Sequence, residues 1–312
     1  MRQILILLSP EADMTRRPNF FIVGAPKSGT TAMDSYLHQH PDIFMGPKEA
    51  HYFSPDVIRD QNFLFSSERY ERLFSEASNE KVVGEGSVHY LVSPEAAKRI
   101  HDFDPKAKIL VHVRNPVDFL YSHHSQQVFE GYEDIEDFQE AYHATDDRRK
   151  GQRIPEKCRF EKILDYREMT NFADQIQRYF DLFGREQVMV TLFDDFKNDT
   201  SSVYRKTLAF LEVDPSFEPA FPVVNPNKKI RSRALMNFIK DTPDWVTSAS
   251  RMVMPLPVRK KLKQWIIRKN TRFQERTPMD QAFRAQLTIE MQPGVERLAK
   301  LIGRDLSAWQ KS

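Results

Sequence analysis

One stretch of the sequence combines a cation, three hydroxyls and a glycine: Lys27, Ser28, Gly29, Thr30 and Thr31. It follows an apolar run at 20–23, which predicts a buried parallel strand, and it precedes a helical pattern. A turn of small residues that enters a helix presents backbone N–H groups at the positive end of the helix dipole. With a lysine and hydroxyls beside those groups, the stretch predicts a phosphate-binding loop.

The loop differs from the nucleoside-triphosphatase motif G-x-x-x-x-G-K-[ST]. Gly24 and Gly29 have the right spacing, but Thr30 follows the second glycine, and Lys27 lies two positions before it. We therefore expect a phosphate site without the lysine geometry that surrounds a magnesium-bound γ-phosphate. An ordinary strand–turn–helix of an α/β domain is the alternative interpretation.

A second candidate phosphate site follows the apolar run 108–113. Arg114 ends that run, and its guanidinium is a fork of donors suited to phosphate. Asn115 and Pro116 are typical of a helix cap and a first helical position, which places Ser122 two turns into the helix. Two separated phosphate sites imply a ligand such as a nucleoside 3′,5′-bisphosphate. The alternatives are a surface ion pair for Arg114 and simple packing for Ser122.

The elements that position these residues alternate between strands and helices. Apolar runs predict strands, and amphipathic or capped segments between them predict helices; the strands are 20–23, 43–45, 81–85, 108–113 and 188–192. This order predicts an α/β fold with a central parallel sheet flanked by helices and a P-loop-like strand–turn–helix at the N-terminus. Ligands of such sheets bind beyond the carboxyl ends of the strands.

The composition is that of a globular protein: 312 residues, 40% hydrophobic and 29% charged. We expect one domain over 1–312, with 1–17 as an N-terminal extension. The single cysteine, Cys158, excludes an internal disulfide framework and favours a reducing compartment. The apolar run 4–8 is too short to span a membrane, so we expect a cytoplasmic protein without a transmembrane segment.

Charge is distributed unevenly along the chain. The net charge is +2, yet residues 228–272 hold thirteen Lys and Arg against two Asp, a balance of +11. This segment is either a solvated face or a surface for anions, including peripheral membrane contact. Its part at 235–275 is a candidate basic helical lid, and Arg231 and Arg233 are candidates for closing over a nucleotide. Residues 130–147 hold eight acids and no Lys or Arg, which predicts a solvated or partner-facing stretch.

Both phosphate motifs resemble known signatures. Residues 26–31 (PKSGTT), followed by Arg114-Asn115-Pro116 and Ser122, resemble the two nucleotide signatures of sulfotransferases, which use 3′-phosphoadenosine 5′-phosphosulfate (PAPS). Residues 48–53 (KEAHYF) and 84–90 (GEGSVHY) resemble segments of the glycan, heparan-type branch. The resemblance extends from about residue 20 over most of the chain and matches a soluble, bacterial-type member.

The resemblance implies a role for each motif residue. Lys27 and the amides of 28–31 would hold the 5′-phosphate, and Lys27 would also stabilise the bridging oxygen as the sulfuryl group leaves. Arg114 and Ser122 would bind the 3′-phosphate, while Glu49 would be the general base. No metal is expected, because the lysine neutralises the developing charge, and the nucleotide product is adenosine 3′,5′-bisphosphate (PAP).

Several residues near Glu49 leave alternatives open. His89 resembles in position the histidine base of cytosolic small-molecule sulfotransferases and is the second candidate for the general base, after Glu49. His51 is the third candidate. Glu85 is a candidate for orienting the acceptor or Lys27, or for capping a neighbouring element. Lys48 either touches an anionic acceptor or balances Glu49. The glycan branch often has lysine after the glutamate of its second motif, where this chain has Gly86.

The sequence therefore predicts a PAPS-dependent sulfotransferase that acts on a hydroxyl or amine of a glycan-like or lipid-linked acceptor, with no nucleic-acid partner. An ATP-dependent kinase is the rival enzyme class, disfavoured by Thr30 at the lysine position. A polyanion- or nucleotide-binding protein without catalysis is the other alternative. Such a protein would use the segment 228–272 and lose affinity steeply with salt.

Overall fold

The computed structural model describes residues 16–59, 64–222 and 277–310, the backbone of 228–230 and 271–273, and isolated positions between 255 and 269. Arg231 and Arg233, and most of the predicted basic lid at 235–275, lie outside the described residues.

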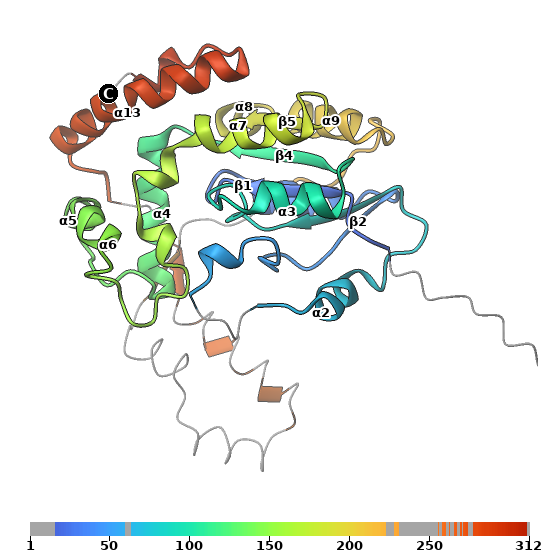
Figure 1. Ribbon diagram of the computed structural model, residues 1–312, viewed down its shortest axis with the longest axis horizontal. Coiled ribbons are helices and arrows are strands. Elements are labelled where there is room, and N and C mark those ends of the chain that lie inside the picture. The colour runs from blue at the N-terminus through green and yellow to red at the C-terminus, as the bar shows by residue number, and fades with distance from the viewer. Residues whose placement is uncertain are drawn as a thin grey trace, which may run out of the picture.

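A five-stranded parallel sheet, in the order β2-β3-β1-β4-β5, forms the centre of the described structure (Figure 1). The strands are β1 (Phe20–Gly24), β2 (Ile43–Met45), β3 (Val82–Gly86), β4 (Lys108–Val113) and β5 (Val188–Leu192). All five confirm the apolar runs predicted from the sequence, within one residue at each end. The runs are continuous because both faces of a parallel sheet are covered.

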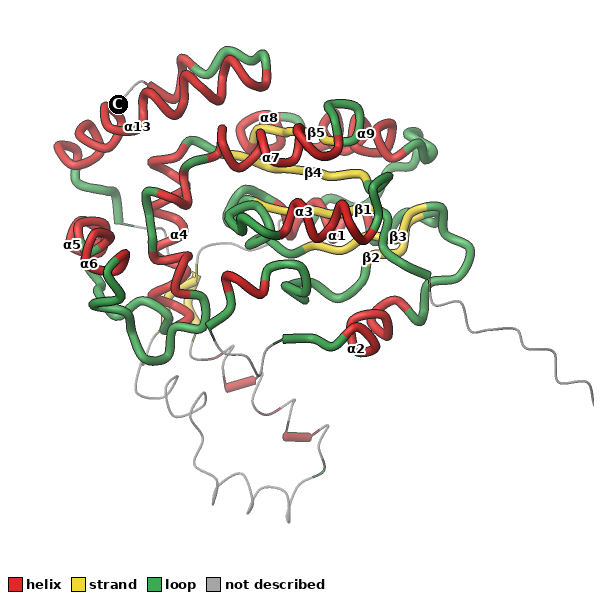
Figure 2. The backbone as a smooth tube through the Cα atoms, in the orientation of Figure 1, coloured by secondary structure: helices red, strands yellow, loops and turns green. Residues whose placement is uncertain are grey.

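Helices cover the sheet on both faces (Figure 2). The described helices are α1 (Thr30–Leu37), α2 (Ser67–Glu71), α3 (Ala96–Phe103), α4 (Pro116–Glu130), α5 (Phe138–His143), α6 (Thr145–Arg149), α7 (Phe172–Phe183), α8 (Phe193–Asn198), α9 (Thr200–Leu211) and α13 (Gln281–Ile302). Along β1, Phe21 and Val23 join the core cluster that contains residues of α3, α4 and α7, and Phe20 and Ile22 join the cluster of α1, α8 and α9. Helix α13 packs on α4 and α7.

The chain reverses direction across the sheet at β1. From β1 it passes to β2 and β3 on one side and then to β4 and β5 on the other. The carboxyl ends of β3, β1 and β4 are therefore neighbours, with Ile22 opposite Gly86 and Gly24 opposite Val111. Such a switch point is where open α/β sheets bind ligands.

Helix α4 begins as its sequence predicts. The Asn115 side chain accepts hydrogen bonds from the backbone N–H groups of Val117 at 2.9 Å and Asp118 at 3.3 Å, and Pro116 is the first helical residue. The helix ends at Gly131, whose φ of 74° suits glycine. This cap fixes the direction in which α4 leaves the end of β4.

The acidic stretch 130–147 is only partly solvated, so that prediction is wrong for its centre. Glu133 is buried, and one of its carboxylate oxygens lies 2.7 Å from Nη2 of Arg148, whose side chain is equally inaccessible. Phe138 and Tyr142 of α5 are buried in the core. Charge counting missed this because apolar residues interleave with the acids at helical spacing.

The C-terminal residues return to the sheet edge that carries Arg114. The indole N–H of Trp309, in the 3-10 helix η6 (Ser307–Gln310), donates to Asp194 at 2.6 Å. The Asn115 side chain donates to the Trp309 carbonyl at 3.2 Å.

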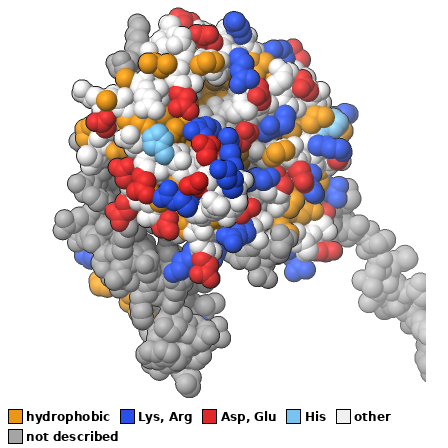
Figure 3. Space-filling view, turned by 60° about the vertical axis from the view of Figure 1, so that its left-hand side comes forward, with side chains coloured by type: hydrophobic (Ala, Val, Ile, Leu, Met, Phe, Trp, Pro, Cys, Tyr) orange, Lys and Arg blue, Asp and Glu red, His pale blue; other side chains and the backbone are white. Residues whose placement is uncertain are grey.

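An antiparallel pair that the sequence did not predict, β6 (Lys228–Ile230) and β7 (Thr271–Phe273), brings the start of the basic segment against α4. On the face shown in Figure 3, by contrast, acidic and basic side chains are interspersed.

Candidate active site

The predicted phosphate loop is a tight turn between β1 and α1. Gly29 precedes the helix as its N-cap residue, with φ of 89°. A Cβ atom there would lie 2.9 Å from Cδ1 of Phe196 on α8, so the position has neither the backbone geometry nor the space for a side chain. Ser28 and Thr30 are buried and Thr31 is half-buried. The first turn of α1 has N–H groups that the helix itself cannot satisfy, which suits an anion.

Lys27 connects this loop to the other predicted phosphate residues. Its ammonium donates to the Gln126 side-chain oxygen on α4 at 3.1 Å, and its backbone carbonyl accepts from Nη1 of Arg114 at 3.3 Å. Gln126 was not among the predicted site residues. Its spacing of four from Ser122 places both on one face of α4, which is the signal that could have identified it.

Arg114 lies half-buried at the carboxyl end of β4. Its guanidinium stands over the Phe193 ring at 4.8 Å from the centroid, and burial lowers its pKa. Ser122 is buried on α4, the helix that also brings Gln126 to Lys27. The structure thus brings the phosphate loop and Arg114 together, with Ser122 on the helix that joins them.

The segment that carries Glu49 runs beside the end of β3. The backbone N–H groups of Gly46 and Glu49 donate to the carbonyls of Gly84 and Gly86, both at 2.9 Å. The Glu49 carboxylate accepts from the Val88 N–H at 3.1 Å. Its side chain is 37% exposed, so one side stays open to a substrate. The surrounding protein still raises the pKa of Glu49, because desolvation outweighs the nearby charge of Lys48.

The other two candidate bases adjoin Glu49. The rings of His51 and His89 stack with centroids 4.6 Å apart, and Nε2 of His51 lies 3.4 Å from the Glu49 carboxylate. Burial lowers the pKa of His51 to about 4 and that of His89 well below its ordinary value. Both imidazoles are therefore neutral near pH 7. All three residues that the sequence nominated as base lie in one cluster.

Glu85 lies within the core near the end of β3. Its buried carboxylate accepts hydrogen bonds from the hydroxyls of Tyr70 at 3.0 Å, Tyr90 at 2.9 Å and Ser87. Burial raises its pKa to about 7, although these hydrogen bonds oppose the shift. Glu85 thereby holds Tyr70 and Tyr90 in place beneath the site.

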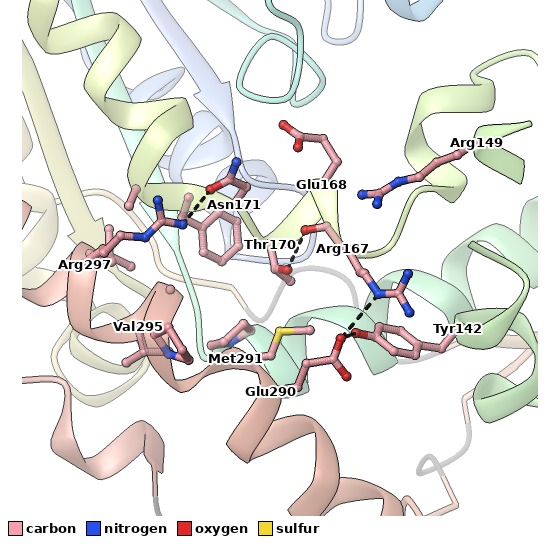
Figure 4. A pocket seen from close by; sticks show the side chains of 16 residues that line it. Tyr142, Arg149, Arg167, Glu168, Thr170, Asn171, Glu290, Met291, Val295 and Arg297 are labelled. Carbon is pink, nitrogen blue, oxygen red and sulfur yellow. Dashed lines mark hydrogen bonds and ion pairs between the residues drawn. The ribbon is translucent and has the colours of Figure 1, made fainter. Parts of the chain in front are cut away.

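A cavity of about 350 Å³ lies between α7 and α13 (Figure 4). Arg297 points toward Asn171 there, and Arg167 contacts Glu290 at 3.3 Å. None of the predicted site residues lines this cavity, and its arginines Arg149, Arg167 and Arg297 are paired with acidic side chains. The predicted site residues converge at the carboxyl ends of the strands and not in this cavity.

Two features are absent from the described part of the chain. There, no three His, Cys, Asp or Glu side chains are placed to hold a metal ion. In the same ranges, no helix has the length and apolarity needed to cross a membrane.

Known proteins resemble this chain in sequence and structure. The crystal structure of a sulfotransferase from Alicyclobacillus acidocaldarius superposes with a TM-score of 0.71 at 33% identity, covering 95% of this chain and 100% of that one. Heparan sulfate glucosamine 3-O-sulfotransferase 6 of Mus musculus is 34% identical over 36% of this chain. Bifunctional heparan sulfate N-deacetylase/N-sulfotransferase 3 of Homo sapiens is 27% identical over 67% of this chain.

This chain spans less than a third of the length of those two curated relatives, 31% and 24% respectively. The model of the Sulfotransferase domain family matches residues 17–243, which include β1 to β5 and every predicted site residue. With that match over most of its length, the chain belongs to the sulfotransferase family.

Proposed function

We propose that this protein transfers a sulfuryl group from PAPS to a hydroxyl or amine of an acceptor. The hydrogen bond between Arg114 and the Lys27 carbonyl carries the proposal, since it joins the two groups that the sequence predicts to bind phosphate, at adjacent strand ends. A ligand with two separated phosphates is the chemistry that such a pair suits.

The residues present fit this donor. Gly29 lets the backbone turn tightly into α1 against Phe196, and Lys27 with the N–H groups of 28–31 supplies positive charge for the 5′-phosphate. Arg114 and Ser122 bind the 3′-phosphate in this proposal. Within 228–272, Arg231 and Arg233 are proposed to add contacts from the basic segment.

Glu49 is the general base in this proposal. It takes the proton of the acceptor hydroxyl while the acceptor oxygen bonds to sulfur, and the bond from sulfur to the bridging oxygen breaks with its electron pair on PAP. Lys27 stabilises that oxygen. A carboxylate with a raised pKa and an open side is a better base here than His89, whose buried imidazole has a strongly lowered pKa.

A glycan acceptor is the class that we favour. The two curated relatives named above are enzymes of heparan sulfate, and the segment around Glu49 resembles the glycan branch. The exposed side of Glu49 leaves a saccharide hydroxyl or amine free to approach. A lipid-linked glycan would satisfy the same chemistry.

The first experiment is calorimetric titration of the protein with PAP and with ATP, first in chelator and then in magnesium. We expect metal-independent binding of PAP and weak binding of ATP. Lys27→Ala should lose PAP affinity, while the exposed Lys197→Ala serves as the control. A preference for ATP with magnesium would instead establish a kinase, and binding of neither nucleotide would leave the polyanion-binding class.

A further inference from the structure

Lys48 has an unusual environment for a lysine. Its side chain is 18% exposed, and its buried ammonium has no hydrogen-bond partner among the described residues. The nearest carboxylate oxygen, Oε1 of Glu49, lies at 4.0 Å, the outer limit of an ion pair. A buried ammonium has three donors to satisfy, and an anionic oxygen of a ligand would satisfy them.

The ammonium occupies the space above Gly86, the last residue of β3. A Cβ atom on Gly86 would lie 3.0 Å from Nζ of Lys48 and 3.3 Å from Oδ1 of Asp34. Asp34 lies one turn into α1 from the phosphate loop, and its Oδ1 also has no hydrogen-bond partner among the described residues. Lys48 therefore fills the volume that a side chain at position 86 would otherwise occupy, between β3 and α1.

The charge of Lys48 acts on groups from α1, from β4 and from its own segment. It lowers the pKa of Asp34 on α1 and of Glu49, against desolvation that raises both. It also contributes to the lowered pKa of His51 and of His112 on β4. The backbone N–H of Ala25, at the start of the phosphate loop, donates to the His112 carbonyl. The ammonium is thus central to the edge where the proposed transfer occurs.

We propose that Lys48 is a second donor-site lysine, whose ammonium binds a non-bridging oxygen of the sulfuryl group in place of a side chain at Gly86. This inference rests on the proposed function, and it assigns Lys48 to the donor rather than to an anionic acceptor. In the transfer, Lys48 holds the charge on the sulfuryl oxygens while Lys27 receives the bridging oxygen and Glu49 the proton. Without donor, Asp34 and Glu49 offset the ammonium charge.

The test compares the affinities of PAPS and PAP by calorimetry, because only PAPS carries the sulfuryl group and no acceptor is needed. Lys48→Met should weaken PAPS binding about tenfold, the loss of one charge-assisted contact, and change PAP binding less than about twofold. The exposed Lys98→Met, which removes only an ion pair with Asp102, should change neither.

The double variant Lys48→Ala/Gly86→Lys moves the ammonium to the other backbone position. Gly86 has no left-handed φ, and the atoms that a new Cβ would meet are those of Lys48 and Asp34, so truncating Lys48 makes the space. We expect this variant to regain most of the PAPS affinity and, with heparan sulfate as acceptor, the turnover that Lys48→Ala loses.

Equal loss of PAPS and PAP affinity in Lys48→Met, or no loss of either, would overturn the assignment, as would failure of the double variant to regain PAPS affinity. If Lys48→Met unfolds because Asp34 is left buried without a cation, Asp34→Asn/Lys48→Met provides the same comparison. Wild-type protein that binds neither nucleotide refutes the proposed function itself, which keeps the two failures distinct.

Discussion

Left-handed backbone at non-glycine residues concentrates in the candidate site. Lys27, Glu49 and His51 have φ values of 59°, 65° and 52°, and the remaining such residues in the described ranges are Arg153 and Glu212. Each left-handed non-glycine residue costs on the order of 1 kcal/mol, so the surrounding hydrogen bonds must hold it in place. Here the backbone bond from Glu49 to Gly86 and the bond from Arg114 to Lys27 do so.

Glu49→Gln should lower turnover by roughly 10²- to 10⁴-fold and leave PAP affinity unchanged, because it removes a base and no phosphate contact. In the wild type, turnover should fall as pH drops through the raised pKa of Glu49, since the base must be ionised. Steady-state rates from pH 4.5 to 8, with PAP titrations, check both effects.

His89→Ala is the comparison for that experiment. We expect it to keep most of the turnover and to lose stability through its stacking on His51. If His89→Ala shows the pattern expected of Glu49→Gln, the base has been assigned to the wrong residue.

Arg114→Ala should remove the preference for PAP over adenosine 5′-monophosphate. A charge-assisted contact to the 3′-phosphate is worth at least about tenfold in affinity, and this preference should disappear with the guanidinium. Competition titrations of the two nucleotides measure it, with Arg297→Ala, whose partner is Asp174, as the control. Undiminished discrimination would place the 3′-phosphate elsewhere.

Among the elements, α8 supports both groups that we propose to bind phosphate. Phe196 and Phe193 close the space beside Gly29, and the Phe193 ring also lies under the Arg114 guanidinium. Asp194, between these two residues in sequence, accepts from Trp309 near the C-terminus. A short helix after β5 therefore contacts both proposed phosphate sites, although it contains no predicted ligand.

Gly29→Ala should abolish PAP binding and lower the melting temperature, since the new Cβ meets Phe196 at 2.9 Å in left-handed backbone. Gly303→Ala is a matched control: its φ is 65°, and no atom lies within 4 Å of the added Cβ. Both variants should lose about 1 kcal/mol to backbone strain. PAP binding retained by Gly29→Ala would show that the loop does not hold the phosphate.

At the scale of the whole molecule, stability should depend on the protonation of Glu85. Its pKa rises from 4.5 unfolded to about 7 in the buried cluster, so the folded state binds the proton more tightly. This contribution is complete below pH 4.5 and is lost as pH rises through 7. It amounts to about 3 kcal/mol. Buried His51 and His112 have lowered pKa values, so their effect on stability is opposite to that of Glu85. Through them, the protein loses stability as pH falls below 6.5.

Glu85→Gln isolates the contribution of Glu85 to the pH dependence of stability, because glutamine resembles the protonated acid and does not titrate. Urea unfolding at pH 4.5, 6 and 8 should show the variant gaining about 3 kcal/mol on the wild type between the lowest and highest pH. The histidine terms are common to both proteins and cancel in the difference. A difference that does not change with pH would mean that Glu85 is ionised throughout.

Local patterns in the sequence were sufficient to predict the strands, the cap of α4 and the two candidate phosphate motifs. These patterns are continuous apolar runs, an Asn-Pro cap and a small-residue turn. Each depends on residues that are adjacent in sequence, so each can be recognised from the sequence alone. The parallel direction of the strands then follows from their alternation with helices, which is why Lys27 and Arg114 could be assigned to one edge of the sheet.

Contacts between distant segments were decided only by the tertiary structure. The burial of Glu85 beneath two tyrosines, the pairing of Glu133 with Arg148, and the position of Lys48 above Gly86 all join residues that carry no local signal for each other. Glu85 and Lys48 are polar residues that a pattern assigns to the surface or to a substrate. Their environment is set by packing across strands, because desolvation and charge depend on what lies within a few ångströms in space.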